Sequence, residues 1–366
     1  MKRIITIIIA VIMVIGAFGF SACGNSAEKA DGYIKGKYRE VTADSYGEIS
    51  ERFEDAKIVR QNAVVFGFTF KSNAEMAVTL NDKIVTLSDF ETIQTILDIT
   101  AEKDEKVVSG LFAKKKVGLK ADENFGIELY NALSSILDIN PDTKGTKAIL
   151  LLSSLDKADI NAEAKAYIKD AKAYVDAYLT GVPESIKTLF REELDFGEWA
   201  KGVKYVFDDD NSDIEDLFDE FAEIRDAINR LKIADKINLT FDDINLYLTM
   251  FDVKFYADKS DNGVKVKLAT TDTTKNKILA ILNSKLPKSM KEVVKNLNIP
   301  KFDIELYLAL DNYNVITAVA GNVDIEVSAN VYENDIKVSL NGAADLSLEI
   351  PDSIDYPSFD GYVAFK

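Results

Sequence analysis

The sequence contains no histidine, and Cys23 is its only cysteine. The absence of histidine excludes Ser-His-Asp and Cys-His catalysis, histidine-ligated zinc and a histidine proton shuttle. Because there is no second cysteine, the chain forms no internal disulfide and its stability must come from packing. The sequence also lacks a glycine-rich phosphate loop and a dinucleotide fingerprint, so we predict that the protein uses no cofactor.

The residue types that remain make up no complete catalytic motif. Ser154-Leu155-Asp156-Lys157 and Ser260-Asp261-Asn262 have the spacings of two motifs of serine β-lactamases and penicillin-binding proteins. The Lys-Thr-Gly strand that completes that set is missing. None of the 61 carboxylates stands out as half of a glycosidase pair. We therefore expect a protein that is not an enzyme.

Basic residues are fewer than acidic ones, 44 against 61, which gives a formal net charge of −17. This balance argues against nucleic acid as a partner, because nucleic acids select basic surfaces. The densest acidic stretch, residues 208–213, offers weak calcium candidates at Asp208, Asp209, Asn211 and Asp213. An EF-hand frame would place Ile214 where the loop needs glycine. We favour a helix N-terminus capped by Ser212 and predict no metal site.

The N-terminus has the three parts of a secretory signal peptide. Lys2 and Arg3 precede an apolar run over residues 4–20, and the run ends at Phe20-Ser21-Ala22-Cys23. The stretch resembles the lipobox of bacterial lipoproteins, although Phe20 stands where that family usually has leucine. The resemblance implies cleavage after residue 22, acylation of Cys23 with palmitate-like chains, and a lipid anchor at the extracytoplasmic face of the cell membrane.

Two alternatives to the lipoprotein signal stay open. One is a signal peptide that is cleaved without lipidation, and the other is an uncleaved membrane-spanning helix, for which 17 apolar residues are near the lower limit. If residues 1–22 are removed, Lys2 and Arg3 go with them, and the net charge becomes 42 minus 61, or −19. Residues 23–32 would then form a short lipidated tether.

Apolar spacing in the first half of the remaining chain predicts a mixed α and β structure. Tyr46, Ile49 and Phe53 recur at helical spacing. Residues 62–70 and 75–80 are rich in Val, Phe and Thr and predict two strands divided by a turn at 71–73. Ser88 with Glu91 forms a capping box, which predicts a short helix to about residue 97.

Residues 141–232 have a helical pattern and predict a helix-rich insert. In this range, Asn161 is placed to cap an alanine-rich helix that ends before Gly181. Ser212 and Glu215 form a second capping box, and a wide apolar stripe follows to Leu231.

After Asp235 the sequence alternates strictly between apolar and polar residues, which is typical of antiparallel strands with one apolar face. The alternating segments are 244–250, 302–310, 323–327, 336–340 and 346–350. Turn signals at 262–263, 321–322 and 341–342 predict tight connections between strands, and prolines are expected to avoid the strands. A helical interruption is expected over about 274–297.

A nine-residue pattern recurs along the chain. Residues 125–133 match residues 302–310 at seven of nine positions, and residues 243–248 are a weaker third copy. The match indicates either a duplicated unit or convergence of alternating strands that draw on few residue types. It favours a strand at 125–133, but Ile127, Tyr130 and Leu133 also have helical spacing, so that stretch is left as strand or helix.

These observations predict one α+β domain over residues 33–366, with a large curved antiparallel sheet covered by helices and a helical middle segment. In outline this resembles the LolA-like lipoprotein carriers, which are half-barrels whose helices close an apolar groove. The resemblance implies that a lipid or another apolar ligand binds between sheet and helices. The alternative is a structural lipoprotein that binds another protein of the cell envelope, and Tyr247, Tyr307 and Tyr332 are candidates for contacting it from the polar sheet face.

Overall fold

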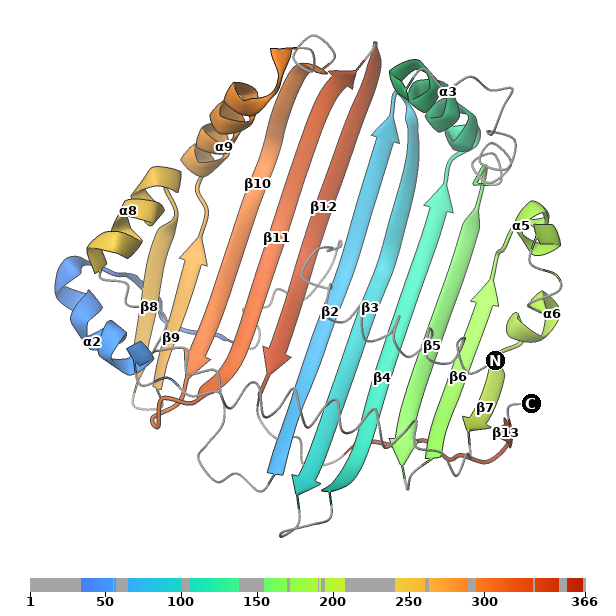
Figure 1. The fold of residues 1–366 in the computed structure, drawn as a ribbon, viewed down its shortest axis with the longest axis horizontal. Coiled ribbons are helices and arrows are strands. Elements are labelled where there is room, and N and C mark those ends of the chain that lie inside the picture. The colour runs from blue at the N-terminus through green and yellow to red at the C-terminus, as the bar shows by residue number, and fades with distance from the viewer. Residues whose placement is uncertain are drawn as a thin grey trace.

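The structure is a computed structural model. It describes residues 34–54, 56, 65–100, 106–137, 155–169, 172–189, 191, 195–207, 241–260, 263–288, 294–331, 333–348 and 354–364. All described strands join one open sheet of 13 strands, in the order β1-β8-β9-β10-β11-β12-β2-β3-β4-β5-β6-β7-β13 (Figure 1). Neighbouring strands are antiparallel except β7 and β13, which are parallel. The prediction of a large antiparallel sheet is therefore confirmed.

Six long strands form the middle of the sheet. They are β10 (Val294–Leu310), β11 (Ile316–Val331), β12 (Asn334–Ser347), β2 (Val65–Leu80), β3 (Lys83–Thr100) and β4 (Lys106–Ala121). The ladder between β12 and β2 joins the two halves of the chain, because residues 336–347 pair with residues 69–80. Successive side chains in these strands point to opposite faces, so the alternation of apolar and polar residues gives the sheet one apolar and one polar face.

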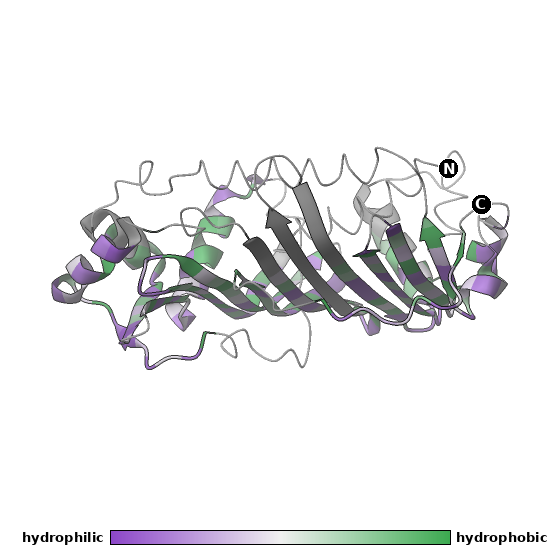
Figure 2. Ribbon diagram, turned by 90° about the horizontal axis from the view of Figure 1, so that it is seen from below, coloured by the Kyte–Doolittle hydropathy of each residue, from purple (hydrophilic) through white to green (hydrophobic). Residues whose placement is uncertain are grey.

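Shorter strands complete the sheet on both sides. They are β8 (Lys254–Ser260) and β9 (Gly263–Ala269) on one side, and β5 (Asp159–Lys169), β6 (Lys172–Thr180) and β7 (Val203–Phe207) on the other. Two-residue strands lie at the edges, with β1 (Arg39–Glu40) beside β8 and β13 (Val363–Ala364) beside β7. Seen along the strands, the sheet forms a single layer with the described helices near its sides (Figure 2).

The helices are α2 (Ala43–Glu54), α3 (Phe125–Leu137), α5 (Glu184–Leu189), α6 (Phe196–Trp199), α8 (Phe241–Phe251) and α9 (Asp272–Lys285). The predicted N-terminal helix is α2. The predicted interruption is α9, which begins with a capping box between Thr271 and Thr274 and ends at Lys285, so the second part of the predicted helical stretch belongs to β10. Asp195 caps α6 by accepting hydrogen bonds from the backbone N–H groups of Gly197 and Glu198.

Three secondary-structure predictions are wrong. The alanine-rich segment after Asn161 is not a helix but the β5–β6 hairpin, because antiparallel pairing with β4 and β7 satisfies its backbone on both sides. The predicted helix from Ser88 to about residue 97 lies within β3. The predicted strand over residues 244–250 lies within α8. The second predicted helix of the insert, residues 212–231, falls outside the described residues.

The turns predicted at 71–73, 321–322 and 341–342 are also absent, because these residues continue β2, β11 and β12. A Cβ atom on Gly321 would approach Cδ2 of Leu306 to 3.2 Å, so this glycine allows close cross-strand packing rather than a turn. Pro300 lies inside β10, contrary to expectation. It falls between Asn298 and Lys301, where the register shifts and the strand makes no regular ladder.

The recurring pattern has different structures at its three positions. Residues 125–133 begin α3 and residues 243–248 lie in α8, whereas residues 302–310 lie in β10. The open choice at 125–133 is thereby settled as helix. The pattern is not a duplicated structural unit, because neighbouring strands determine its structure in β10 and packing of one apolar face determines it in α3.

Candidate functional site

The described side chains give the sheet an apolar face on β8 to β12 and β2, and again on β4 to β7. Cross-strand register arranges its side chains in rows that run across the strands. One row is Phe255, Leu268, Leu306, Gly321, Ala344 and Ser72 and, on the far side of β3, Lys115, Ala164, Ala177 and Val203. We call this the central row. On one side of it, the next row contains Leu308, Val319, Leu346 and Phe70. On the other side, the next row contains Ile304, Val323 and Gly342, and the row beyond that one contains Phe302, Ile325, Leu340, Met76 and Leu87.

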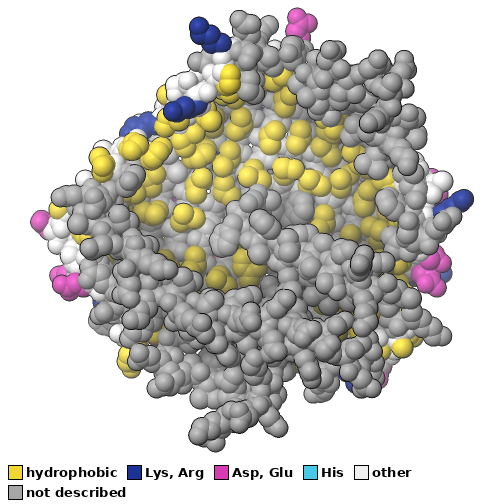
Figure 3. Space-filling model, in the orientation of Figure 1, with side chains coloured by type: hydrophobic (Ala, Val, Ile, Leu, Met, Phe, Trp, Pro, Cys, Tyr) yellow, Lys and Arg dark blue, Asp and Glu magenta, His cyan; other side chains and the backbone are white. Residues whose placement is uncertain are grey.

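Helices cover two ends of the apolar face. Ile49 of α2 is buried against Ala257, Val264 and Val266 of β8 and β9. Phe125 and Ala132 of α3 are buried with Leu80 and Ala121 at the ends of β2 and β4. Between these clusters, apolar side chains gather over the sheet in the space-filling view (Figure 3). Leu306 lies in this region and is 53% exposed, which is unusual for a leucine in the middle of a long inner strand.

Lys115 is a charged residue on this apolar face. Residues 113, 115, 117 and 119 share one face of β4, and Leu119 packs against the α3 cluster, which identifies that face as the apolar one. Lys114 and Lys116 point to the opposite, polar face by the same alternation. Burial lowers the pKa of the Lys115 ammonium, because the charged form loses water.

The polar face carries cross-strand ion pairs over β9 to β12. Glu305 is the most connected of these groups: it pairs with Lys267, accepts a hydrogen bond of 2.7 Å from the Tyr307 hydroxyl, and accepts one of 3.3 Å from the Asn322 amide. Burial by itself raises the pKa of Glu305, but these three donors outweigh it and hold the pKa below its usual value. Lys301 pairs with Asp324 on the same face.

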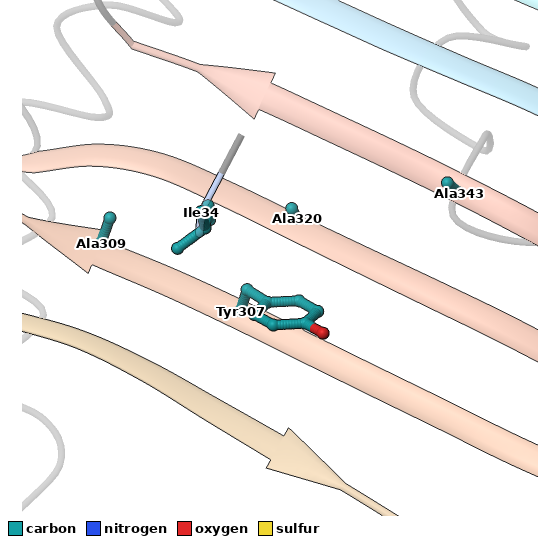
Figure 4. Close-up of a cluster of buried hydrophobic side chains, with 5 residues drawn as sticks. All are labelled: Ile34, Tyr307, Ala309, Ala320 and Ala343. Atoms are coloured by element: carbon teal, nitrogen blue, oxygen red, sulfur yellow. The ribbon is translucent and has the colours of Figure 1, made fainter. Parts of the chain in front are cut away.

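Both described ends of the chain pack against the polar face. Ile34 is fully buried among Tyr307, Ala309, Ala320 and Ala343 (Figure 4). At the C-terminal end, the ring of Phe359 stacks on that of Tyr174 of β6 with centroids 3.8 Å apart. Packing of the chain ends on the polar face leaves the apolar face as the candidate site for a ligand.

The predicted tyrosine contacts are only partly placed by the structure. Tyr307 is on the polar face, as predicted, but it is only 3% exposed and its hydroxyl is used by Glu305, so it does not present itself to a partner. Tyr247 lies in α8 rather than in a strand. Tyr332 falls outside the described residues.

Several other predicted residues also fall outside the described residues. They are Cys23, the calcium candidates Asp208, Asp209, Asn211 and Asp213, and Ser154, Asp261 and Asn262. Ser260 pairs with Gly263 at the end of the β8–β9 hairpin. Within the described part of the chain, no group of three or more acidic or cysteine side chains is placed to hold a metal ion. No described helix is long and apolar enough to cross a bilayer.

No protein-family model, curated protein or solved structure matches this chain. Its function must therefore be argued from the geometry of the two sheet faces.

Asp345 of β12 makes the polar face pH-sensitive. It lies opposite Lys71 and Ala320, and burial raises its pKa to about 6 although the Lys71 charge opposes the shift. Between pH 3.8 and 6 the folded state therefore binds more protons than the unfolded state, so this group's contribution to stability falls as the pH rises through that window.

We expect Asp345→Asn to remove this pH-dependent loss. The variant should gain about 1–2 kcal/mol in free energy of unfolding relative to the wild type between pH 4 and pH 7.5, after allowance for solvent screening. Urea unfolding of both proteins, followed by circular dichroism at the two pH values, measures the difference. A difference that is the same at both values would contradict the assignment.

Proposed function

We propose that this chain is a non-enzymatic, lipid-anchored lipoprotein at the extracytoplasmic face of the cell membrane, and that it binds a lipid or another apolar ligand on the apolar face of its sheet. The observation that carries the proposal is the apolar face of the sheet, on which Leu306, in an inner strand, is 53% exposed. Removing such surface from water is favourable by roughly 25 cal/mol per Å², so the face favours an apolar occupant.

The anchor and the shape of the site are further parts of the proposal. The lipobox-like sequence at Cys23 supports a lipid anchor. The clusters of α2 and α3 on the apolar face support a site between sheet and helices. A half-barrel that curves around the ligand, as in the LolA-like carriers, belongs to this proposal.

A second candidate is an interaction with another protein of the cell envelope. Four large apolar side chains are more than 40% exposed on α8 and α9: Leu246, Met250, Ile281 and Leu282. Exposed apolar groups that lie close together often mark contact surfaces. Cross-linking in intact cells, with a photoreactive amino acid at position 246, would detect such a partner.

Ligand binding is tested by native mass spectrometry of the full chain released from a non-ionic detergent, followed by organic extraction and lipid analysis. We expect an adduct with the mass of a lipid. The amount of adduct should fall at least tenfold in Leu306→Glu, because an apolar ligand would have to remove water from a carboxylate at this position. The substitution should cost little stability, because Leu306 is half exposed.

Leu282→Glu is the matched control, because Leu282 is 44% exposed but lies on α9 and not on the sheet face. The control should keep the adduct. An equal adduct in wild type and in Leu306→Glu would contradict binding on the apolar face. Absence of any adduct in the wild type would reject ligand binding and favour the protein-interaction candidate.

A further inference from the structure

The central row combines apolar surface with a single charge. Lys115 is the one charged residue on the apolar face among the described side chains of nine strands. These strands are β2, β4 to β7, β9, β10 from Phe302 onward, β11 and β12. Its neighbours on that face are Ala113 and Val117 along β4 and Ala164 across on β5. A cation in these surroundings has lost much of its hydration, which strengthens its attraction to an anion that arrives with an apolar chain.

From this arrangement we propose that Lys115 binds the carboxylate of a fatty acid whose acyl chain lies along the central row toward β10. The proposal rests on the proposed function, and it specifies the chemical class of the ligand and the direction in which it lies. The argument for this occupant is charge complementarity: the single ammonium of the central row, set among apolar side chains, matches a single carboxylate on an apolar chain.

The dimensions of the row agree with an acyl chain. From Lys115 the row passes β3 and β2 and reaches β12, which is three steps of about 4.8 Å, or about 14 Å in all. One leaflet of a bilayer, about half of the ~30 Å hydrocarbon core, has a similar thickness. A chain of membrane length that starts at Lys115 would therefore end near Ala344, with Gly321 and the exposed Leu306 beyond it.

The side chains along this path leave room for the acyl chain. Ser72, Ala344 and Gly321 are small. The row on one side carries larger residues, Leu308, Val319, Leu346 and Phe70, and the row on the other side carries Ile304, Val323 and the small Gly342. Leu306 lies over Gly321 at the far end. Lys115 makes an interaction of its own within the chain, so the carboxylate would replace or join that contact.

The test compares palmitate with 1-hexadecanol, which has an acyl-length chain but no charge. Each is added to the full chain in non-ionic detergent at pH 7.4, and adducts are counted by native mass spectrometry. We expect wild type to prefer palmitate over hexadecanol by about tenfold or more, as one charged hydrogen bond provides. Lys115→Met should lose this preference for palmitate but still bind hexadecanol. Lys115→Arg should retain the preference for palmitate.

Lys114→Met is the matched control, because Lys114 adjoins Lys115 but faces the polar side of the sheet. It should behave as wild type. Circular dichroism of Lys115→Met should show a cooperative thermal transition like that of the wild type, which shows that the variant folds. If wild type binds both compounds equally, or if Lys114→Met loses the preference as fully as Lys115→Met, the inference is overturned while the proposed function stands. If wild type binds neither compound, both are overturned.

Discussion

Phe125→Ala is expected to lower the free energy of unfolding by about 3–5 kcal/mol, the usual cost of removing a buried phenylalanine. Phe125 is 1% exposed and is the first residue of α3, where it packs with Leu80, Ala121 and Ala158. Its removal would leave a cavity between the helix and the strand ends that neither backbone can close. Chemical unfolding followed by circular dichroism measures the loss.

Ile127→Ala, in the same helix, is the control for this effect. Ile127 is 46% exposed, so its truncation should change the free energy of unfolding by no more than about 0.5 kcal/mol. Both substitutions introduce alanine, which makes any gain in helix propensity common to both variants. Similar losses for the two variants would show that α3 is not held to the sheet by Phe125.

Cys23→Ser is expected to abolish lipidation completely. In the proposed processing the cysteine thiol carries the acyl group, and a serine hydroxyl is a much weaker nucleophile than a thiolate. Cells that are fed an alkyne analogue of palmitate should label the wild-type protein and leave Cys23→Ser unlabelled. Intact mass should show a wild-type chain that begins at residue 23 and carries acyl groups, and a variant that keeps residues 1–22.

The alternatives at the N-terminus give different results in the same experiment. A signal peptide cleaved without lipidation would give an unlabelled wild type of shortened mass, and Cys23→Ser would have no effect. An uncleaved membrane span would give a full-length wild type without label. Ser21→Ala keeps a small residue in the lipobox and should be labelled as wild type is, which controls for disturbance of the segment as such.

The spacing of apolar residues correctly predicted the strands and the helix that have one apolar face. The alternation over residues 302–310, 323–327 and 336–340 predicted the long strands β10, β11 and β12, and the spacing of Tyr46, Ile49 and Phe53 predicted α2. In these segments, the residues that alternate or recur lie on one face of their strand or helix. Local pattern and tertiary packing therefore point to the same structure.

The β5–β6 hairpin shows where this reasoning failed. Its alanines favour a helix by intrinsic propensity, and that preference dominated the prediction. The segment Asp-Ile-Asn-Ala-Glu-Ala-Lys-Ala-Tyr-Ile-Lys over 159–169 nevertheless alternates without a break between polar and apolar residues. Alternation was the signal that could have identified the strand, because alanine fits the crowded inner face of a sheet as well as it fits a helix.

The similar sequences of α3 and β10 show a limit of a different kind. Seven of nine residues are the same in 125–133 and 302–310, yet one segment is a helix and the other a strand. The difference comes from outside the segments: β10 has partners on both sides, β9 and β11, whereas Phe125, Leu129 and Ala132 pack one helical face against strand ends. No property of nine residues alone predicts this outcome.

For the candidate site, the sequence predicted an apolar sheet face but not its charge. The leucine and isoleucine stripes indicated an apolar surface or core. Lys115 was not singled out, because in Lys114-Lys115-Lys116 the three residues look alike until the register with β5 divides them between two faces. Pairing with β5, about 50 positions later in the chain, determines which face each lysine occupies. Local sequence therefore could not predict it.

The two short edge strands have a consequence for how this protein behaves at high local concentration. An open sheet has two free sides to which further strands of other molecules can add, and here β1 and β13 each occupy part of one side. On β8, beside β1, Lys254 pairs with Glu40 of β1 and Lys259 with Glu48 of α2, so that these side chains hold β1 and α2 at this edge. Loss of β1 or β13 by proteolysis is therefore expected to expose more of the backbone of β8 or β7 and to favour pairing with strands of other molecules.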